Sequence, residues 1–357
     1  GGALAQSAED PGADIFTLFH FPGSVSQAIE RHRIRTSFLQ RLPGLRRWYR
    51  HYLPLFPRAI ASFDLARYDL IVSLSHCVAK GAGRGSGVPH LSYCFTPMRY
   101  LWDQASMYFN RERYSRPVLF ALERVLERLR RWDRATHPDR YVAISRYVAE
   151  RIRRVWGCES EVIHPPVDAD RFHPRDHHED FYLVVSALVA YKRIDLAVDA
   201  ANRLGRKLVI VGKGEDRPRL ERRAGPTVTF LGWRPDEEVA GLLSRCRAFL
   251  LPGEEDFGIA PLEAMASGRP VIAFGRGGAV ETVVDARTPG PDAPTGILFA
   301  EPSGESLAEA MLELEDREGE FNSSGLRTHA NRFSLPRFRR EVAAALLEFV
   351  EVKGRPH

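Results

Sequence analysis

The sequence is poor in cysteine, and it contains no apolar run long enough to cross a membrane. Its four cysteines, among 357 residues, are widely spaced, and none belongs to a C-x-x-C pair. Reduced thiols in a cytosolic protein are therefore the expectation. No stretch of about 18 apolar residues occurs in the printed sequence, so no transmembrane helix is expected within it.

Two groups of binding motifs are also missing. Gly212 and Gly214 give only G-x-G after a predicted strand, and the lack of a full G-x-G-x-x-G disfavours a dehydrogenase. No helix-turn-helix, zinc-finger or RNP-type motif accompanies the net charge of +5, so nucleic acid is not expected as a partner. The mild basic excess is compatible with an anionic membrane or an anionic substrate.

The length and composition predict a globular protein of two domains. Each half of a 357-residue chain can bury its own core, and 44% hydrophobic with 27% charged residues is typical of soluble proteins. Short apolar runs alternate with helical patterns, which predicts an α/β fold with parallel sheets. The predicted strands are 13–20, 68–74, 90–95, 141–145, 181–187, 207–212, 227–231, 248–251 and 270–274.

The most informative stretch runs from 248 to 285. It begins with a buried strand, Ala248–Leu251, and a helix should begin near Ile259 and stop at Gly268. Gly258, just before that helix, lets the backbone come close to a ligand. The free N–H groups of the helix N-terminus are suited to a phosphate.

Two carboxylates, Glu255 and Glu263, flank this predicted phosphate site. A carboxylate beside a phosphate is unfavourable unless something binds it, and sugar or ribose hydroxyls are natural donors to carboxylates. The combination therefore points to a sugar attached to a phosphate. The alternative is a plain α/β loop that carries two helix-favouring glutamates.

This stretch resembles the family 4 retaining glycosyltransferases. Their signature is two glutamates separated by seven residues with Phe-Gly after the first, which here reads E-D-F-G-I-A-P-L-E and continues A-M-A-S-G-R-P-V-I-A. The resemblance spans nearly the whole chain and implies the GT-B fold, two Rossmann-like domains facing each other across a cleft. It implies an acceptor domain at 1–175 with its first strand missing, a donor domain at 176–335, and a C-terminal helix at 336–357 that packs on the first domain.

The resemblance also implies the roles of donor-site residues. Glu255 and Lys192 are the expected catalytic residues, with Lys192 at the leaving diphosphate and Glu255 at the sugar, while Glu263 holds the ribose hydroxyls. The arginine that usually accompanies the lysine is replaced by Ala187, and Arg193 is expected to compensate. The remaining implied donor-binding residues are Phe257, Gly258, Ile259, Ala260, Ser186, Arg193, Gly212, Gly232, Arg234, Gly1 and Gly2.

The N-terminal half departs from the family pattern. Gly1 and Gly2 match the Gly-Gly loop near the donor phosphates if the strand before them is absent; an expression remnant is the alternative. Phe95 stands where relatives commonly carry a histidine. His76 and Arg99 are the candidate contacts to acceptor or sugar, the alternatives being a structural histidine and a structural ion pair.

Two further stretches suggest a surface role. Basic and aromatic residues mix over 35–57, and an amphipathic, arginine-rich helix is predicted over 114–137. Both fit a peripheral membrane contact, and both equally fit packed helices with a solvated basic face. The glycine-rich residues 80–89 are predicted to form a mobile loop. Histidines in 173–178 lack partners at metal-ligand spacing, so no metal site is expected.

The function implied by the resemblance is transfer of a hexose from a nucleoside-diphosphate sugar with retained anomeric configuration and without a metal or other cofactor. The N-terminal strings look closest to bacterial O-antigen and exopolysaccharide mannosyltransferases, which makes GDP-mannose the first expectation for the donor. The expected acceptor is a glycan or a lipid-linked glycan, and the expected location is the cytoplasm or the inner face of the membrane. A catalytically weak GT-B protein and a GT-B phosphorylase or epimerase are the alternatives.

Overall fold

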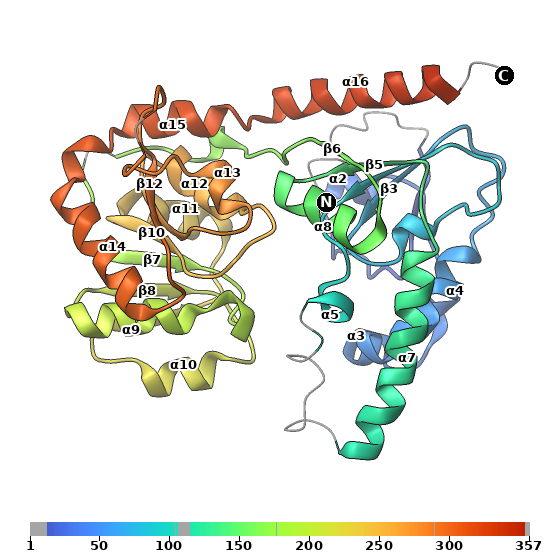
Figure 1. The fold of residues 1–357 in the computed structure, drawn as a ribbon, viewed down its shortest axis with the longest axis horizontal. Helices are drawn as coiled ribbons and strands as arrows, with labels where there is room; N and C mark the ends of the chain where they lie inside the picture. The colour runs from blue at the N-terminus through green and yellow to red at the C-terminus, as the bar shows by residue number, and fades with distance from the viewer. Residues whose placement is uncertain (1–12, 104, 106–114, 176, 289, 354–357) are drawn as a thin grey trace. The chain divides into compact units, whose positions relative to one another are not determined.

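The chain forms two compact units, each built on parallel β-sheet. The computed structural model describes residues 13–103, 105, 115–175, 177–288 and 290–353. Unit 1 comprises Gly1–Ile163 with Arg339–His357, and unit 2 comprises His164–Phe338. Figure 1 shows both units. The predicted α/β class with two Rossmann-like domains is confirmed.

Unit 2 contains a six-stranded parallel sheet in the order β12-β11-β10-β7-β8-β9. Its strands are β7 (Tyr182–Val185), β8 (Leu208–Val211), β9 (Val228–Gly232), β10 (Ala248–Leu251), β11 (Val271–Phe274) and β12 (Gly296–Phe299). The chain moves outward from β7 to β9, then returns to place β10 on the other side of β7. In open parallel sheets such a reversal of strand order marks the ligand site, at the carboxyl ends of the two central strands.

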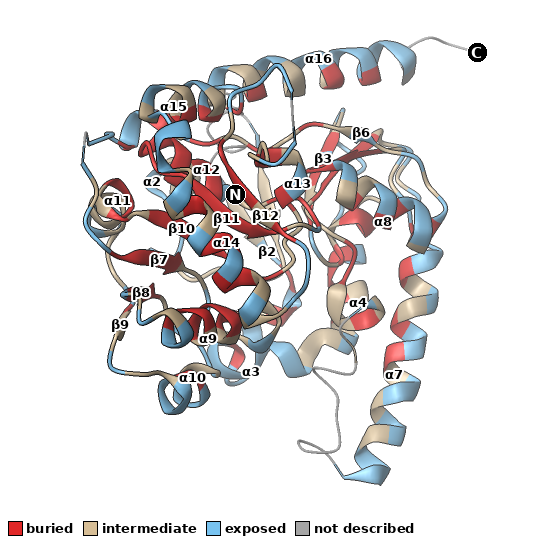
Figure 2. Ribbon diagram, turned by 60° about the vertical axis from the view of Figure 1, so that its left-hand side comes forward, coloured by how far each residue is buried: buried red, intermediate tan, exposed pale blue. Residues whose placement is uncertain are grey.

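Helices cover both faces of this sheet (Figure 1). One group contains α9 (Ile194–Leu204), α10 (Arg217–Arg223) and α14 (Gly304–Asp316), and the other contains α11 (Asp236–Arg245), α12 (Ile259–Ala266), α13 (Ala279–Thr282) and α15 (Ser323–Asn331). Unit 2 also contains three short 3₁₀ segments: η4 (Ala169–Arg171), η5 (Ala190–Lys192) and η6 (Glu318–Glu320). Strands β7, β10 and β11 are buried almost throughout (Figure 2), as their uninterrupted apolar runs require.

Unit 1 contains a two-stranded and a four-stranded parallel sheet. The strands are β1 (Ile15–Thr17) with β2 (Ile34–Thr36), and β3 (Ile71–Ser75), β4 (His90–Cys94), β5 (Arg140–Ala143) and β6 (Glu161–Val162). The helical segments are α2 (Gln27–Glu30), η1 (Phe38–Arg41), α3 (Leu45–Trp48), η2 (Tyr49–Leu55), α4 (Phe56–Ala61), η3 (Ala79–Gly81), α5 (Arg99–Trp102), α7 (Arg116–Arg134) and α8 (Arg146–Trp156). Helix α16 (Leu335–Lys353) begins in unit 2 and continues into unit 1. No helix among the described residues has the length and apolar character needed to span a bilayer.

The prediction of a mobile loop at 80–89 is wrong at its first residue. The Lys80 side chain is fully buried, with Nζ 3.1 Å from Asp133 Oδ1 and 3.5 Å from the centre of the Trp156 ring. The other carboxylate oxygen, Asp133 Oδ2, accepts the indole N–H groups of Trp102 and Trp156 at 2.8 Å each. A buried ammonium persists only with such partners, so this residue ties η3 to α7 and cannot be part of a freely moving loop.

Replacing Lys80 should destabilise unit 1 strongly. Lys80→Met leaves the Asp133 carboxylate buried without its cation, which we expect to lower the free energy of unfolding by about 3–5 kcal/mol. The matched control is Arg154→Met, which removes one positive charge from an ion pair whose arginine side chain is 65% exposed and should cost at most about 1 kcal/mol. Urea unfolding followed by tryptophan fluorescence measures both, and equal stability of the two variants would refute the structural importance of the buried pair.

Candidate active site

Lys192 and Glu255 meet at the point where the strand order of unit 2 reverses. Lys192 closes η5 after β7, and Glu255 lies in the loop after β10. The ammonium of Lys192 donates a hydrogen bond to Glu255 Oε1, and the two side chains are 19% and 18% exposed. A Cβ on Gly253 would lie 2.7 Å from the carbonyl oxygen of Lys192, so the two loops touch main chain to main chain. The two residues predicted to be catalytic thus form an ion pair with each other.

The loop that carries Glu255 is held by the loop after β11. The amide of Gly278 donates to the carbonyl oxygen of Glu255 at 2.8 Å. A Cβ on Gly278 would lie 2.3 Å from the Cα of Phe257, so no larger residue fits there without moving one of the loops. The position of Glu255 is therefore set by backbone contacts from a second loop.

Helix α12 begins directly after this loop, as predicted. Gly258 is its N-cap with φ of 91°, a left-handed conformation that glycine adopts without strain. Gly258 has no side chain with which to cap this end, and the free first-turn amides of a helix, here beginning at Ile259 and Ala260, are suited to an anion.

The ring of Phe257, next to this helix end, is buried and not exposed to solvent. Its side chain is 2% exposed and packs against His164 and Phe333, with ring centroids 5.4 and 5.8 Å away. Any part that Phe257 has in donor binding is thus carried by its main chain and by the conformation it gives the loop.

Glu263, on α12, has no hydrogen-bond partner among the described residues. Its side chain makes no hydrogen bond or ion pair with the described residues, and burial raises the pKa of its carboxyl above the ordinary value. The Arg171 guanidinium opposes this rise in pKa, and Asp236 adds to it. An acceptor group held in this state is suited to neutral hydroxyl donors. The sequence analysis missed Arg171, although it follows the P-P-V-D-A-D string directly.

Ser186, Gly212 and Gly232 gather at the carboxyl ends of β7, β8 and β9. The Ser186 amide donates to Val211 O at 3.0 Å, and the Gly212 amide donates to Gly232 O at 2.8 Å. A Cβ on Gly212 would lie 1.8 Å from the Ser186 carbonyl oxygen. The backbones that follow β7 and β8 therefore also touch each other, at Ser186 and Gly212.

The two predicted donor-site arginines are engaged locally. Arg193, with φ of 51°, lies over the start of α9 and contacts Asp195 at 3.2 Å and the carbonyl oxygen of Pro302 at 3.3 Å. Arg234 pairs with Glu238 at 3.3 Å at the start of α11. Neither contact joins the Lys192–Glu255 pair, so compensation by Arg193 for the missing arginine requires breaking its bond to Asp195.

The candidate residues of unit 1 follow the carboxyl ends of two neighbouring strands in its four-stranded sheet. His76 is exposed directly after β3, and Arg99 is the first residue of α5, shortly after the neighbouring strand β4. Phe95 packs edge-on against Tyr93, with ring centroids 5.7 Å apart. Gly1 and Gly2 lie outside the described residues.

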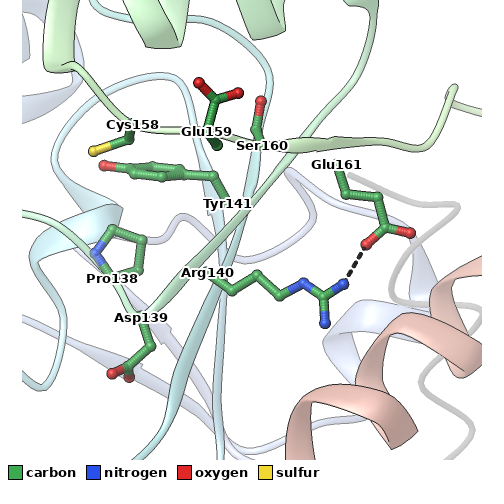
Figure 3. Close-up of a pocket in the computed structure, with 8 residues that line it drawn as sticks. All are labelled: Pro138, Asp139, Arg140, Tyr141, Cys158, Glu159, Ser160 and Glu161. Carbon is green, nitrogen blue, oxygen red and sulfur yellow. Dashed lines mark hydrogen bonds and ion pairs between the residues drawn. The ribbon is translucent and has the colours of Figure 1, made fainter. Parts of the chain in front are cut away.

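A hollow in unit 1 contains none of the predicted residues (Figure 3). It is lined by Pro138, Asp139, Arg140, Tyr141, Cys158, Glu159, Ser160 and Glu161. These residues surround the amino ends of β5 and β6, the end of the sheet opposite to His76 and Arg99. Within the part of the chain that the structure describes, no three histidine, cysteine or acidic side chains gather as a metal site would require.

Two protein-family models match the chain in succession. The model described as "Glycosyltransferase Family 4" matches residues 4–171, and the model described as "Glycosyl transferases group 1" matches residues 168–328. The chain is 31% identical over 154 residues to the O-antigen chain mannosyltransferase C of Escherichia coli, covering 41% of this chain and 40% of that protein. It is 29% identical over 222 residues to the D-inositol 3-phosphate glycosyltransferase of Mycobacteroides abscessus, covering 55% and 48%. The chain spans about half the length of such curated relatives.

Solved structures share the fold over almost the entire chain. A sucrose-phosphate synthase from Thermosynechococcus elongatus has a TM-score of 0.69 at 20% identity, covering 99% of this chain and 92% of that one. HepE from Anabaena in complex with UDP has a TM-score of 0.66 at 16% identity, covering 98% and 96%. At this identity the likeness shows the fold, which is the GT-B arrangement expected from the sequence.

The half-buried carboxylate of Glu263 predicts a stability that depends on pH. Because burial raises its pKa above the ordinary 4.5, ionised Glu263 destabilises the folded state at pH 7, where the unfolded chain is also ionised. Glu263→Gln should therefore raise the thermal midpoint at pH 7, and the gain should shrink as the pH falls through the folded pKa toward 4.5. The control is Glu237→Gln, an exposed residue on α11. A gain that stays constant with pH, or that is equal in the control, would contradict this prediction.

Proposed function

We propose that this chain, which belongs to the family 4 glycosyltransferases and has their GT-B fold, transfers a hexose from a nucleoside-diphosphate sugar with retention of anomeric configuration. The observation that carries the proposal is the Lys192–Glu255 pair beside the uncapped start of α12 and the unpartnered Glu263. A cation and an uncapped helix end suit a diphosphate. Two carboxylates beside them suit the hydroxyls of a sugar and a ribose.

Donor binding would exchange the partners within this site. The ammonium of Lys192 and the first amides of α12 would bind the diphosphate and stabilise the charge that develops as it leaves. Glu255, freed from Lys192, would hold sugar hydroxyls and stabilise positive charge at the anomeric carbon, while Glu263 would accept from the ribose. No protein nucleophile is needed if the reaction occurs on one face of the sugar. The anomeric C–O bond to the diphosphate breaks, the acceptor oxygen bonds on the same face, and its proton passes to the leaving diphosphate.

GDP-mannose is the donor that the relatives favour. A GDP-mannose-dependent phosphatidylinositol monomannoside mannosyltransferase of Mycolicibacterium smegmatis is 32% identical over 177 residues, covering 41% of this chain. By analogy, the acceptor would be a glycan or a lipid-linked glycan of a bacterial surface polysaccharide, used without a metal ion.

A catalytically weak sugar-nucleotide-binding protein is the second candidate. Ala187 is exposed where the family carries an arginine, and Arg193 is bonded to Asp195 instead. The diphosphate would then meet one lysine, a point charge, in place of a lysine and a bidentate arginine. This candidate predicts donor binding with little transfer or hydrolysis.

A thermal-shift panel tests the donor site. GDP-mannose, UDP-glucose and ADP-glucose are compared on wild type, Glu263→Ala and the surface control Glu237→Ala. A donor at about 100 times its Kd should stabilise the wild type and the control by about 2.7 kcal/mol, and Glu263→Ala should lose most of this shift. No shift with any donor, or an equal shift in Glu263→Ala, would count against the assignment.

Turnover tests Glu255. Removing a group that stabilises charge in the transition state typically lowers kcat by about 100-fold or more, and we expect this of Glu255→Ala in release of GDP from GDP-mannose. Its fold should survive, because the backbone contact to Gly278 does not use the side chain. Near-normal turnover of Glu255→Ala would remove its catalytic role. Weak turnover in the wild type together with a clear thermal shift would favour the second candidate.

A membrane contact of unit 1 is also proposed, on the exposed half of α7. Phe120 is 63% exposed, and exposed arginines share the helix: Arg116, Arg124, Arg128, Arg131 and Arg134. Trp48, 50% exposed, adds an aromatic side chain on α3. Apolar side chains among arginines are typical of helices that lie on anionic bilayers.

Liposome flotation tests this surface. The wild type should float with vesicles of phosphatidylglycerol and phosphatidylcholine, less so in high salt, and Phe120→Ser should reduce the floating fraction severalfold. Val350→Ser, an exposed apolar position on α16 of the same unit, is the control. Failure of the wild type to float would refute the contact.

A further inference from the structure

His164, the first residue of unit 2, packs directly on the loop that carries Glu255. Its ring stacks on Phe257 with centroids 5.4 Å apart and an interplanar angle of 21°. It also meets Phe333 edge-on at 5.6 Å. Phe257 is two residues from Glu255 and directly precedes Gly258, the N-cap of α12. A side chain that fixes Phe257 therefore fixes the loop between the predicted catalytic carboxylate and the predicted phosphate site.

A carboxylate from the next loop sets the orientation of His164. The ring Nε2 lies 3.0 Å from Glu281 Oε2, and the Glu281 side chain is only 9% exposed. A ring that is stacked on one face and hydrogen-bonded at its edge has little freedom to rotate. Its position is therefore determined by α13, the helix that bears Glu281.

The segment Gly278–Glu281 thus holds the Glu255 loop in two ways. The amide of Gly278 binds the carbonyl oxygen of Glu255 directly, at 2.8 Å. Glu281 holds His164, and His164 holds Phe257. One contact fixes the loop beside Glu255, and the other fixes it two residues later.

His164 also lies where the chain enters unit 2, bonded to the segment by which it leaves. The carbonyl oxygen of His164 accepts from Arg337 Nη2 at 2.7 Å, and the amide of Val167 donates to Phe333 O at 2.8 Å. Arg337 is one residue before the last residue of unit 2. His164 therefore contacts the Glu255 loop through its ring and the departing segment through its main-chain carbonyl.

We propose that His164 is a positioning residue for the reaction: it holds Phe257, and through it the Glu255 loop, in the conformation that binds the donor. The inference rests on the proposed role of Glu255. A histidine that only fills the core would affect the stability of unit 2 without a specific effect on this loop.

The chain offers a matched control for this distinction. His329 also packs on Phe333, with centroids 5.8 Å apart, and bonds to α13 through Thr282 O at 2.8 Å. No ring contact between His329 and Phe257 occurs among the described residues. His329→Ala therefore removes a comparable aromatic contact and hydrogen bond, while the stack on Phe257 remains.

The first measurement is hydrogen exchange of the amides at 254–260, which needs no ligand. His164→Ala should speed exchange at these residues more than His329→Ala does. His164→Phe, which keeps the ring, and His164→Gln, which keeps a group able to bond Glu281, should each lie between wild type and His164→Ala. Equal exchange in His164→Ala and wild type, or an equal increase in His329→Ala, would overturn the inference.

The second measurement is a split between turnover and affinity, with GDP-mannose as substrate and GDP as ligand. Because a small misplacement of a catalytic group lowers rate far more than binding, His164→Ala should lower kcat by about tenfold or more and change the Kd of GDP by less than about threefold. Adding Glu281→Gln to His164→Ala should lower kcat little further, since the two side chains act through one contact.

The outcomes separate this inference from the proposed function. Normal kcat in His164→Ala, with kcat lost in Glu255→Ala, would refute the positioning role alone. Normal kcat in both variants would refute the catalytic role of Glu255 and this inference with it. A fall in kcat matched by His329→Ala would show that His164 acts only through stability.

Discussion

Unit 2, which carries the candidate active site, depends on close contact between loop backbones where the strand order of its sheet reverses. The loops after β7, β10 and β11 meet there at glycines, and a Cβ at Gly253 or Gly278 would lie 2.7 or 2.3 Å from a backbone atom of another loop. Such contacts leave little room for adjustment, so the side chains these loops carry are placed by the sheet itself. Lys192 and Glu255 form their ion pair because of this packing.

The charged groups where the strand order reverses fit the proposed donor. Lys192 and Glu255 satisfy each other, whereas Glu263 is half-buried, with a raised pKa and no hydrogen-bond partner among the described residues. Partial burial without a partner disfavours the ionised carboxylate, as the direction of its pKa shift shows. A donor that brings a diphosphate for the lysine and hydroxyls for the two glutamates would satisfy all three groups at once.

The sequence predicted the parts of the structure that follow from local rules. The buried strand Ala248–Leu251 and the start of α12 at Ile259 were found at the residues predicted, since apolar runs, glycine and helix-start signals are read along the chain. The burial of Lys80 and the His164–Glu281 pair were not predicted, because their partners are 53 and 117 residues away in the sequence. The roles of Arg193 and Arg234 stay predictions; the local ion pairs that now engage both side chains depend on side-chain geometry that no spacing reveals.

A crystal structure of the protein with GDP-mannose would test the central claim most directly. The account predicts the diphosphate within hydrogen-bond distance of Lys192 Nζ and of the first amides of α12, the ribose hydroxyls on Glu263, and Glu255 released from Lys192 and turned to the sugar. A nucleotide bound elsewhere, with the Lys192–Glu255 pair intact and Glu263 still without a partner, would contradict it.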